Sequence, residues 1–418
     1  MTRPMLTGYR VLDLSQFVAG PTCGRILAEL GAEVIKIELA PAGDRSRAQG
    51  VKPQDARFAG SSQSSYFVQH NHSKRCVALD LKHPRGAELV RSLVARSDVV
   101  VENFAPGVMA RAGLAYADLQ KVNPRIIMCS ISFAGQSGPL SHKPGYDYVA
   151  QAYAGITGLV GEPEQSPAMI SMALGDVATG VSAAMAVAVA LLHRERTGEG
   201  QHIESTLIDT YFHMHEVNVP RIGLRGGAYV PRRTGSQHPD GGPTGIFHYR
   251  DDEYITIVAL PHQWPQIVKV LGEPALADDP RFKTARDRRA NNAALKDIIE
   301  RWLKEFPSRD SALQALEQER IPCAPVLTLK EAMALPHLRE RGTVRRVNDP
   351  RLGEFDIPGP PARFSRWPVP TGIEAGLLGE HNEAVLRDVL GMSDAAIAGL
   401  YADKVLVHDP ACEQADRP

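Results

Sequence analysis

One carboxylate stands out in the sequence because of the residues around it. Asp176 follows a glycine and precedes a long run of small apolar residues in "ALGDVATGVSAAMAVAVALLHRERTGEGQ", residues 173–201. An aspartate in front of a helix usually accepts hydrogen bonds from the first backbone N–H groups, which favours its ionised form. An ionised carboxylate in a cleft that holds little water can also act as a nucleophile. Asp176 is therefore a helix cap, a reactive group, or both.

The other reactive residue types lack the spacing that their chemistry needs. No serine lies in a G-x-S-x-G turn, and His213 and His215 are two residues apart, which on a helix points them in different directions. The five cysteines are scattered without CxxC spacing, so they indicate neither a zinc site nor a disulfide framework. We expect no bound metal and no prosthetic group.

The N-terminal stretch has the strand–turn–helix–strand form of a mononucleotide-binding unit. It reads "VLDLSQFVAGPTCGRILAELGAEVIKIE", with only Gly20 and Gly24 near the turn. Because the G-x-G-x-x-G pattern is missing, a nicotinamide or flavin site is weakly supported. Backbone N–H groups at the start of the helix could still hold a phosphate, or the glycines could only shape the turn.

Composition and charge narrow the class of protein. The chain has 418 residues, is 43% hydrophobic and 23% charged, and carries a formal net charge of −1. These values are typical of a globular protein with two or three folding units, and they predict no basic surface for nucleic acid or membranes. The first residues lack a secretory apolar region, and the apolar run 177–193 is short for a bilayer. We expect a cytoplasmic protein that contacts no membrane.

Strand-like and helix-like segments alternate along the first part of the chain. Short apolar stretches separated by helical spacing predict βαβ units and a mostly parallel sheet. The expected strands are 11–14, 34–38, 77–81, 99–102, 126–131 and 202–207, and the expected helices are 22–30, 84–96 and 177–194. A strand at 255–260 with helices at 264–270 and 293–304 predicts a smaller α+β unit, and 384–402 predicts a terminal helical piece.

These elements give a domain plan for the whole chain. Its parts are the N-terminal part of a large domain (1–215), a linker and glycine-rich loop (216–245), a small domain (246–325), a return linker with the C-terminal part of the large domain (326–408) and a frayed tail (409–418). The overall fold class is α/β.

Several stretches, in order, resemble the family III CoA-transferases, which include carnitine and bile-acid CoA-transferases, formyl-CoA transferase and related acyl-CoA racemases. They are "VLDLSQFVAGP", "GAEVIKIE", "LDLKHPRG", "VVVENFAPGVMARAGL", "PGYDYVAQA", "GDVATG" and "LLHRERTGEGQHIESTLIDT". The resemblance implies a Rossmann-like large domain, a smaller α+β domain and an interlocked homodimer. It also implies acyl-CoA and a small carboxylic acid as substrates, with Asp176 attacking the donor thioester to form a mixed anhydride.

The same resemblance implies a set of CoA contacts. They are Phe17, Val18, Leu79, Lys82, Asn103, Phe104, Arg111 and Lys143. Cations suit the phosphates, and an amide with apolar surface suits pantetheine and adenine. The chain departs from some members at Leu39, where an arginine follows the "KIE" strand, so one phosphate contact is lost or supplied from elsewhere.

The racemases of this fold are the first alternative, and a non-catalytic CoA-binding protein is the second. The racemases need a histidine where this chain has Tyr146 and a glutamate where it has Pro261. A phenol is a poor base at neutral pH and proline has no basic group, so racemisation lacks two of its groups. Transfer needs only the carboxylate and a shaped site.

The acid substrate and the access to the site are less strongly encoded. Arg221, Arg225, Arg232 and Arg233 could hold a second carboxylate, which favours a dicarboxylic acid such as succinate or a C5 relative, although surface solvation explains the same residues. The glycine-rich segment 232–245 could fold over Asp176 as a lid that excludes water, or it could be a plain linker.

Overall fold

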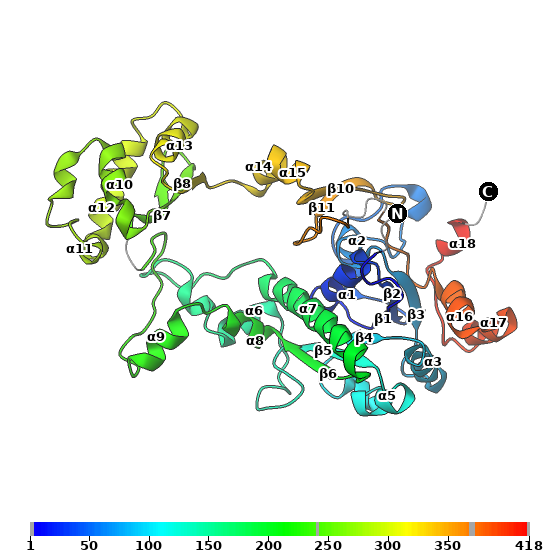
Figure 1. The fold of residues 1–418 in the computed structure, drawn as a ribbon. Coiled ribbons are helices and arrows are strands. Elements are labelled where there is room, and N and C mark those ends of the chain that lie inside the picture. Colours follow the sequence, from blue (N-terminus) through cyan, green and yellow to red (C-terminus); the bar gives the residue numbers. More distant parts are fainter. Residues whose placement is uncertain (1–3, 240–241, 368–372, 416–418) are drawn as a thin grey trace. The chain divides into compact units, whose positions relative to one another are not determined.

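The computed structural model describes residues 4–239, 242–367 and 373–415, which form two compact units (Figure 1). The first unit combines the chain up to Ala154 with Ser171–Glu216 and the part from Pro336 onward. The second unit combines Gly155–Ile170 with Val217–Leu335. The chain therefore leaves the first unit twice and returns to it, whereas the domain plan from the sequence has a single departure.

The first unit is built on a six-stranded, wholly parallel sheet. Its strand order is β3-β2-β1-β4-β5-β6, which is the order of a Rossmann fold. The strands are rich in valine and isoleucine because both faces of a parallel sheet are covered by helices. Their bounds are β1 (Arg10–Asp13), β2 (Glu33–Leu39), β3 (Arg75–Leu79), β4 (Val99–Glu102), β5 (Ile127–Ser132) and β6 (His202–Thr206). The predicted parallel sheet is confirmed.

Two helices of this unit lie side by side in very close contact (Figure 1). They are α1 (Ala19–Glu29) and α7 (Leu174–Thr197). A Cβ atom added at Gly180 of α7 would lie 2.5 Å from the carbonyl oxygen of Ala19, so only glycine permits this approach. The small residues that the sequence placed in α7 therefore bring two helix backbones together.

The main hydrophobic core joins the sheet to another group of helices. The core is formed by strand residues together with apolar residues of α3 (Pro84–Val94), α5 (Tyr116–Val122), α16 (Asn382–Leu390) and α17 (Asp394–Ala402). The single C-terminal helical piece expected from the sequence is two helices, because Gly391 ends α16 in a left-handed conformation with φ of 66°.

The remaining elements of the first unit are short. They are η1 (Arg45–Ala48), η2 (Ala56–Phe58), α2 (Ser65–Asn71), α4 (Val108–Arg111), α6 (Asp147–Tyr153), α8 (Leu207–His213), α15 (Pro336–Glu340), the antiparallel pair β10 (Val344–Asp349) and β11 (Gly353–Pro358), and α18 (Cys412–Ala415).

The second unit is a smaller α+β domain, as predicted. Its antiparallel sheet has the order β7-β8-β9, with strands Thr244–His248, Tyr254–Val258 and Cys323–Pro325. Trp264, Phe282 and Trp302 are among the buried residues of a separate core. The other elements are η3 (Thr157–Leu159), α9 (Asn218–Leu224), η4 (Pro261–Gln263), α10 (Trp264–Leu271), η5 (Pro274–Ala277), α11 (Ala285–Ala290), α12 (Asn292–Leu303), α13 (Arg309–Gln318) and α14 (Leu329–Ala334).

Three details of the domain plan differ from the structure. Residues 155–170, which we had placed in the large domain, join the second unit, where Arg233 donates hydrogen bonds to the carbonyls of Glu162, Pro163 and Gln165. The predicted linker 216–245 contains helix α9 and the start of β7. The predicted tail is ordered at its beginning, because Asp409 is buried and accepts a hydrogen bond from the backbone N–H of Ser62.

Some predicted segments extend beyond the described residues. These are residues 240–241 of the glycine-rich loop, residues 368–372 of the return linker and residues 416–418 of the tail.

Helix α7 is longer than the apolar run seen in the sequence. Among the described residues, this 24-residue helix is long and apolar enough to cross a membrane, judged by length and composition alone. A helix in the core of a domain passes the same test, and the small-residue face of α7 packs against α1.

Candidate active site

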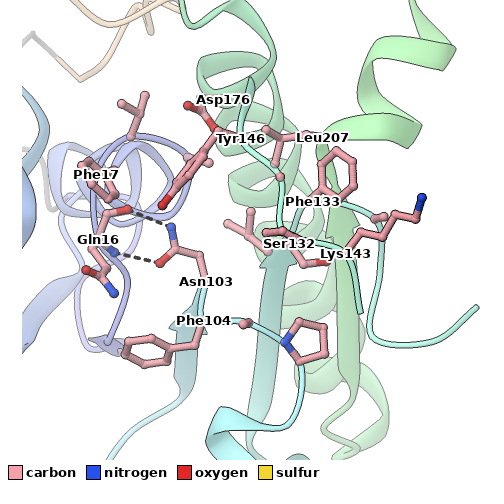
Figure 2. Close-up of a pocket in the computed structure, with 18 of the residues that line it drawn as sticks. Gln16, Phe17, Asn103, Phe104, Ser132, Phe133, Lys143, Tyr146, Asp176 and Leu207 are labelled. Carbon is pink, nitrogen blue, oxygen red and sulfur yellow. Dashed lines mark hydrogen bonds between the residues drawn. The ribbon is translucent and has the colours of Figure 1, made fainter. Parts of the chain in front are cut away.

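A cavity of about 330 Å³ opens in the first unit at the carboxyl ends of the parallel strands (Figure 2). Gln16 and Phe17 follow β1, Asn103 follows β4, and Ser132 ends β5. The strand order reverses between β1 and β4, and open parallel sheets bind ligands at this switch point. The full lining is Gln16, Phe17, Val18, Ala19, Arg45, Asn103, Phe104, Ala105, Pro106, Ile131, Ser132, Phe133, Ala134, Ser141, Lys143, Pro144, Gly145, Tyr146, Asp176 and Leu207.

Asp176 lies in this cavity, but it is not the cap of its helix. Helix α7 begins at Leu174, and its N-cap position is Ala173, whose side chain makes no capping hydrogen bond. Asp176 is therefore in the first turn, and no described residue donates a hydrogen bond to its carboxylate. The prediction that the helix start caps and ionises Asp176 is wrong, because the helix begins at Leu174, two residues before Asp176.

Another aspartate takes the capping role. Asp147, at the start of α6, is buried, and its Oδ2 accepts the backbone N–H of Asp176 at 2.8 Å. Its Oδ1 accepts the Tyr211 hydroxyl at 2.7 Å and the side-chain N–H of Gln151 at 2.8 Å. The Tyr211 oxygen in turn accepts the N–H of Gly175 at 2.9 Å. A single buried carboxylate thus organises the first turn of α7.

The Asp176 carboxyl is poised between its two protonation states. Burial, and after it the negative charge of Asp147, raises the pKa of Asp176 to about 7. Loss of hydration disfavours the charged form, and a like charge nearby adds to this effect. A carboxylate that is poorly solvated and receives no hydrogen bond at its oxygens is a stronger nucleophile than one in water.

The loop after β1 is held in an unusual conformation beside Asp176. Phe17 has a φ of 64°, a region that non-glycine residues rarely adopt. Its N–H donates to Oδ1 of Asp44 at 3.0 Å, and the amide of Asn103 bonds both backbone groups of Gln16 at 2.8 Å (Figure 2). The Phe17 ring meets the ring of Tyr146 edge-on, with centroids 6.3 Å apart. These contacts fix one wall of the cavity.

Two buried ion pairs lie next to this loop. Lys36 forms an ion pair with Asp44 at 2.8 Å, and Lys74 forms one with Asp13 at 2.7 Å. Burial opposes the ionisation of Asp44, but Lys36 and the N–H groups of Phe17 and Ser46 outweigh it and keep the pKa of Asp44 below its ordinary value. Asp44 therefore stays an acceptor for Phe17.

The structure gathers six of the predicted site residues and leaves three apart. Phe17, Val18, Asn103, Phe104 and Lys143 line the cavity with Asp176. The other three do not line it: Leu79 is fully buried in the core at the end of β3, and Lys82 and Arg111 are exposed. The expected CoA contacts of all eight residues stay predictions. Asn103 already uses its amide to hold Gln16.

The arginines expected to bind a second carboxylate belong to the second unit. Arg221 and Arg225 lie close to the Tyr229 ring, and the Arg233 guanidinium is occupied by backbone carbonyls. Pro261 also belongs to this unit. Tyr146, by contrast, lines the cavity with 65% of its surface exposed.

Sequence reasoning missed three residues of this site. They are Arg45, which lines the cavity, and Asp147 with Tyr211, which order the first turn of α7. The signal for Asp147 was present, because it follows Tyr146 at the start of a short helical stretch. Tyr211 gives no local signal, since its partners are far away in sequence. Across the described ranges, no group of three or more His, Cys, Asp or Glu side chains is arranged to hold a metal.

Comparison with known proteins identifies the family. Residues 6–382 match CoA-transferase family III. The chain therefore belongs to CoA-transferase family III, and it is a CoA-transferase. The resemblance drawn from the sequence motifs is confirmed.

Relatives with CoA-transferase names match over almost the whole chain. The succinyl-CoA–D-citramalate CoA-transferase of Chloroflexus aurantiacus is 32% identical over 402 residues, covering 96% of this chain and 98% of the relative. The succinyl-CoA:glutarate CoA-transferase of Mus musculus is 33% identical, covering 96% and 90%. The formyl-CoA:oxalate CoA-transferase of Rhodopseudomonas palustris is 34% identical, covering 95% and 96%.

Solved structures share the fold. A CAIB/BAIF family protein from Brucella suis superposes with a TM-score of 0.80 at 33% identity, covering 93% of this chain and all of the other. A protein from Mycobacterium tuberculosis gives a TM-score of 0.78 at 30% identity, covering 91% and 99%.

Proposed function

We propose that this CoA-transferase moves CoA from an acyl-CoA thioester to a dicarboxylic acid, with Asp176 as the nucleophile. The observation that carries the proposal is the position of Asp176 in the cavity at the β1–β4 switch point, with a partly desolvated carboxyl. Two of the relatives are named for succinyl-CoA together with citramalate or glutarate, which supports a C4 or C5 dicarboxylic acid.

The proposed reaction conserves the energy of the thioester. A carboxylate oxygen of Asp176 attacks the thioester carbonyl carbon, the C–S bond breaks, and CoA leaves as a thiolate. A carboxylate oxygen of the incoming acid attacks the Asp176 carbonyl carbon of the resulting mixed anhydride. The bond from that carbon to the bridging oxygen breaks, and the donor acid departs as a carboxylate. The thiolate then attacks the new acyl carbonyl carbon, which forms the product thioester and frees Asp176. One thioester is made for each one broken, so the reaction needs no ATP.

Racemisation is the weaker proposal for the same fold. Its two remaining groups would have to come from Tyr146 and Pro261, and neither side chain is a useful base at neutral pH. The transferase mechanism asks only for the Asp176 carboxylate and exclusion of water from the anhydride.

We also propose a homodimer, and a cytoplasmic location. Support for a partner comes from the outer face of α7, where apolar side chains recur at helical spacing. Val177, Val181, Met185, Val189 and Leu192 are 38–64% exposed. A continuous apolar stripe of this kind on a helix is typical of a surface that another chain covers. Sedimentation velocity at several protein concentrations tests the dimer.

The proposed chemistry is tested by trapping the intermediate. Protein incubated with succinyl-CoA and hydroxylamine should release CoA and form a hydroxamate, and peptide mass spectrometry should place any protein-bound label on Asp176. Asp176→Asn, which keeps the shape of the side chain, should give neither product. A label on another residue, or exchange of CoA into glutarate by the Asp176→Asn variant, contradicts the proposal.

A further inference from the structure

Arg45 is a cation of the cavity whose charge no described side chain neutralises. It begins the short helix η1, is exposed, and lines the same cavity as Asp176. No ion pair or hydrogen bond joins its guanidinium to another described residue. The other cation of the lining, Lys143, donates a hydrogen bond to the Tyr153 hydroxyl at 3.0 Å. An arginine without a partner in a ligand cavity is available to an anionic group.

The neighbouring arginine shows the contrast. Arg47, two residues further along η1, is buried and donates two hydrogen bonds of 2.7 Å to Glu38. Its guanidinium is part of the structure beneath the cavity. The sequence "DRSR" therefore contains one arginine committed to the fold and one that faces the cavity.

A series of contacts links the backbone at Arg45 to the turn of Asp176. Asp44, the preceding residue, caps η1 through Ser46 and holds the N–H of Phe17 in the cavity wall. Phe17 in turn meets the ring of Tyr146, and Asp147, the next residue, accepts the backbone N–H of Asp176. These contacts connect the residue before Arg45 to the turn that carries Asp176, and both side chains line the same cavity of about 330 Å³.

This location favours one anion over another. In CoA the pantetheine arm separates the thioester sulfur from the phosphates, so a phosphate lies far from the carbon that Asp176 attacks. In a succinyl or glutaryl group the second carboxylate is only two or three methylenes from that carbon. A guanidinium near Asp176 therefore matches the distal carboxylate, which it can bind with two parallel hydrogen bonds.

We infer that Arg45 selects dicarboxylic acyl groups by binding their distal carboxylate while Asp176 attacks the proximal carbonyl. The inference rests on the proposed function, because it concerns acyl groups carried by Asp176. Arg45 takes the role that the sequence had assigned to Arg221, Arg225, Arg232 and Arg233.

The experiment compares two thioesters that differ only at the far end of the acyl chain. Succinyl-CoA carries a carboxylate where butyryl-CoA carries a methyl group, and both present the same CoA. Release of CoA in the presence of hydroxylamine gives kcat/KM for each, with Asp176→Asn as the blank. Any contact of Arg45 with CoA itself cancels in the ratio of the two values.

Arg45→Ala should lower the succinyl-to-butyryl ratio by about 10- to 100-fold, the size expected for loss of a charge-assisted contact. Arg45→Lys should restore part of the ratio, since lysine keeps the charge but not the paired donors. Arg387→Ala, an exposed arginine of α16 outside the cavity, should leave it unchanged. Melting temperatures report whether each variant is folded.

Two results would overturn the inference. One is a folded Arg45→Ala variant whose succinyl-to-butyryl ratio of kcat/KM is unchanged, whether the two kcat/KM values stay the same or fall together. If both fall, repeating the assay with dephospho-CoA thioesters shows whether the guanidinium contacts the 3′-phosphate. The other is a wild-type protein that processes butyryl-CoA and rejects succinyl-CoA. Wild-type protein that releases CoA from neither thioester overturns the proposed function itself, before any variant is compared.

Discussion

The carboxylate of Asp147 accepts the backbone N–H of Asp176 at 2.8 Å, so one aspartate holds the peptide of another. The arrangement places a buried negative charge next to the group that we propose as the nucleophile. It orders the first turn of α7 and at the same time makes ionisation of Asp176 harder. Positioning and acidity are thereby coupled through a single side chain.

The first prediction concerns the pH dependence of catalysis. Since the pKa of Asp176 is raised to about 7, the carboxylate form is lost as the pH falls through that value. We expect kcat/KM for succinyl-CoA to decline about tenfold for each pH unit below the pKa of the free enzyme. The rate of hydroxylamine-coupled CoA release, followed between about pH 5 and 9, measures this decline, which is the acidic limb of the pH profile. A flat profile down to about pH 5 would argue that Asp176 ionises like an exposed aspartate.

The second prediction separates the charge of Asp147 from its shape. Asp147→Asn keeps an oxygen for the N–H of Asp176 but removes the like charge, so the acidic limb should move to lower pH. The measurement is the same pH profile. Tyr211→Phe is the matched control, because it leaves the charge in place while depriving Gly175 of an acceptor. Tyr211→Phe should lower the free energy of unfolding by about 1–3 kcal/mol, and it should not move the acidic limb of the profile to lower pH.

The third prediction links Asp176 to folding stability. Its pKa is raised from the model-peptide range to about 7, so the native state holds this proton more tightly than the unfolded chain does. The carboxyl therefore destabilises the fold progressively as the pH rises from about 4 to 7, by up to about 4 kcal/mol. Asp176→Asn should be more stable than wild type at about pH 8, and the difference should vanish near pH 4. Urea unfolding at both pH values measures it, and equal stability at pH 8 would contradict the raised pKa.

The fourth prediction tests the close packing at the start of α7. A Cβ at Gly175 would lie 2.1 Å from the Tyr211 ring, so Gly175→Ala must displace that ring and break its bond to Asp147. We expect a loss of about 1–3 kcal/mol in stability and a fall in kcat. Gly399→Ala in α17 has open space around the new methyl group and should be neutral or stabilising by up to about 1 kcal/mol. Thermal unfolding and the turnover assay compare the two, and equal behaviour would show that Tyr211 is not held as described.

Local patterns were sufficient to predict the frame of this protein. The valine-rich stretches such as Val99–Glu102 and the helical spacing between them gave the parallel sheet, because hydrophobic periodicity follows directly from burial. They also placed Asp176, Phe17 and Asn103 at strand ends or helix starts, where ligands of such sheets bind. The smaller α+β domain followed from the same patterns.

The errors have a common physical origin in contacts between distant residues. Asp176 was assigned as a cap because Gly175 looked like a helix start, whereas Asp147, 29 residues earlier, supplies the acceptor. Arg45 and Arg47 are indistinguishable in sequence, and only the position of Glu38 decides which one is buried.

The contact between α1 and α7 has a consequence for how this chain can change its chemistry. Gly180 meets the main chain at Ala19, so the spacing between the loop of Phe17 and the turn of Asp176 is set by backbone meeting backbone. A side chain of the lining that makes no contact with the loop or the turn, such as that of Arg45, can be exchanged without moving either one. New acids can thus be accommodated by replacing residues such as Arg45, while the spacing between the Phe17 loop and the Asp176 turn stays the same.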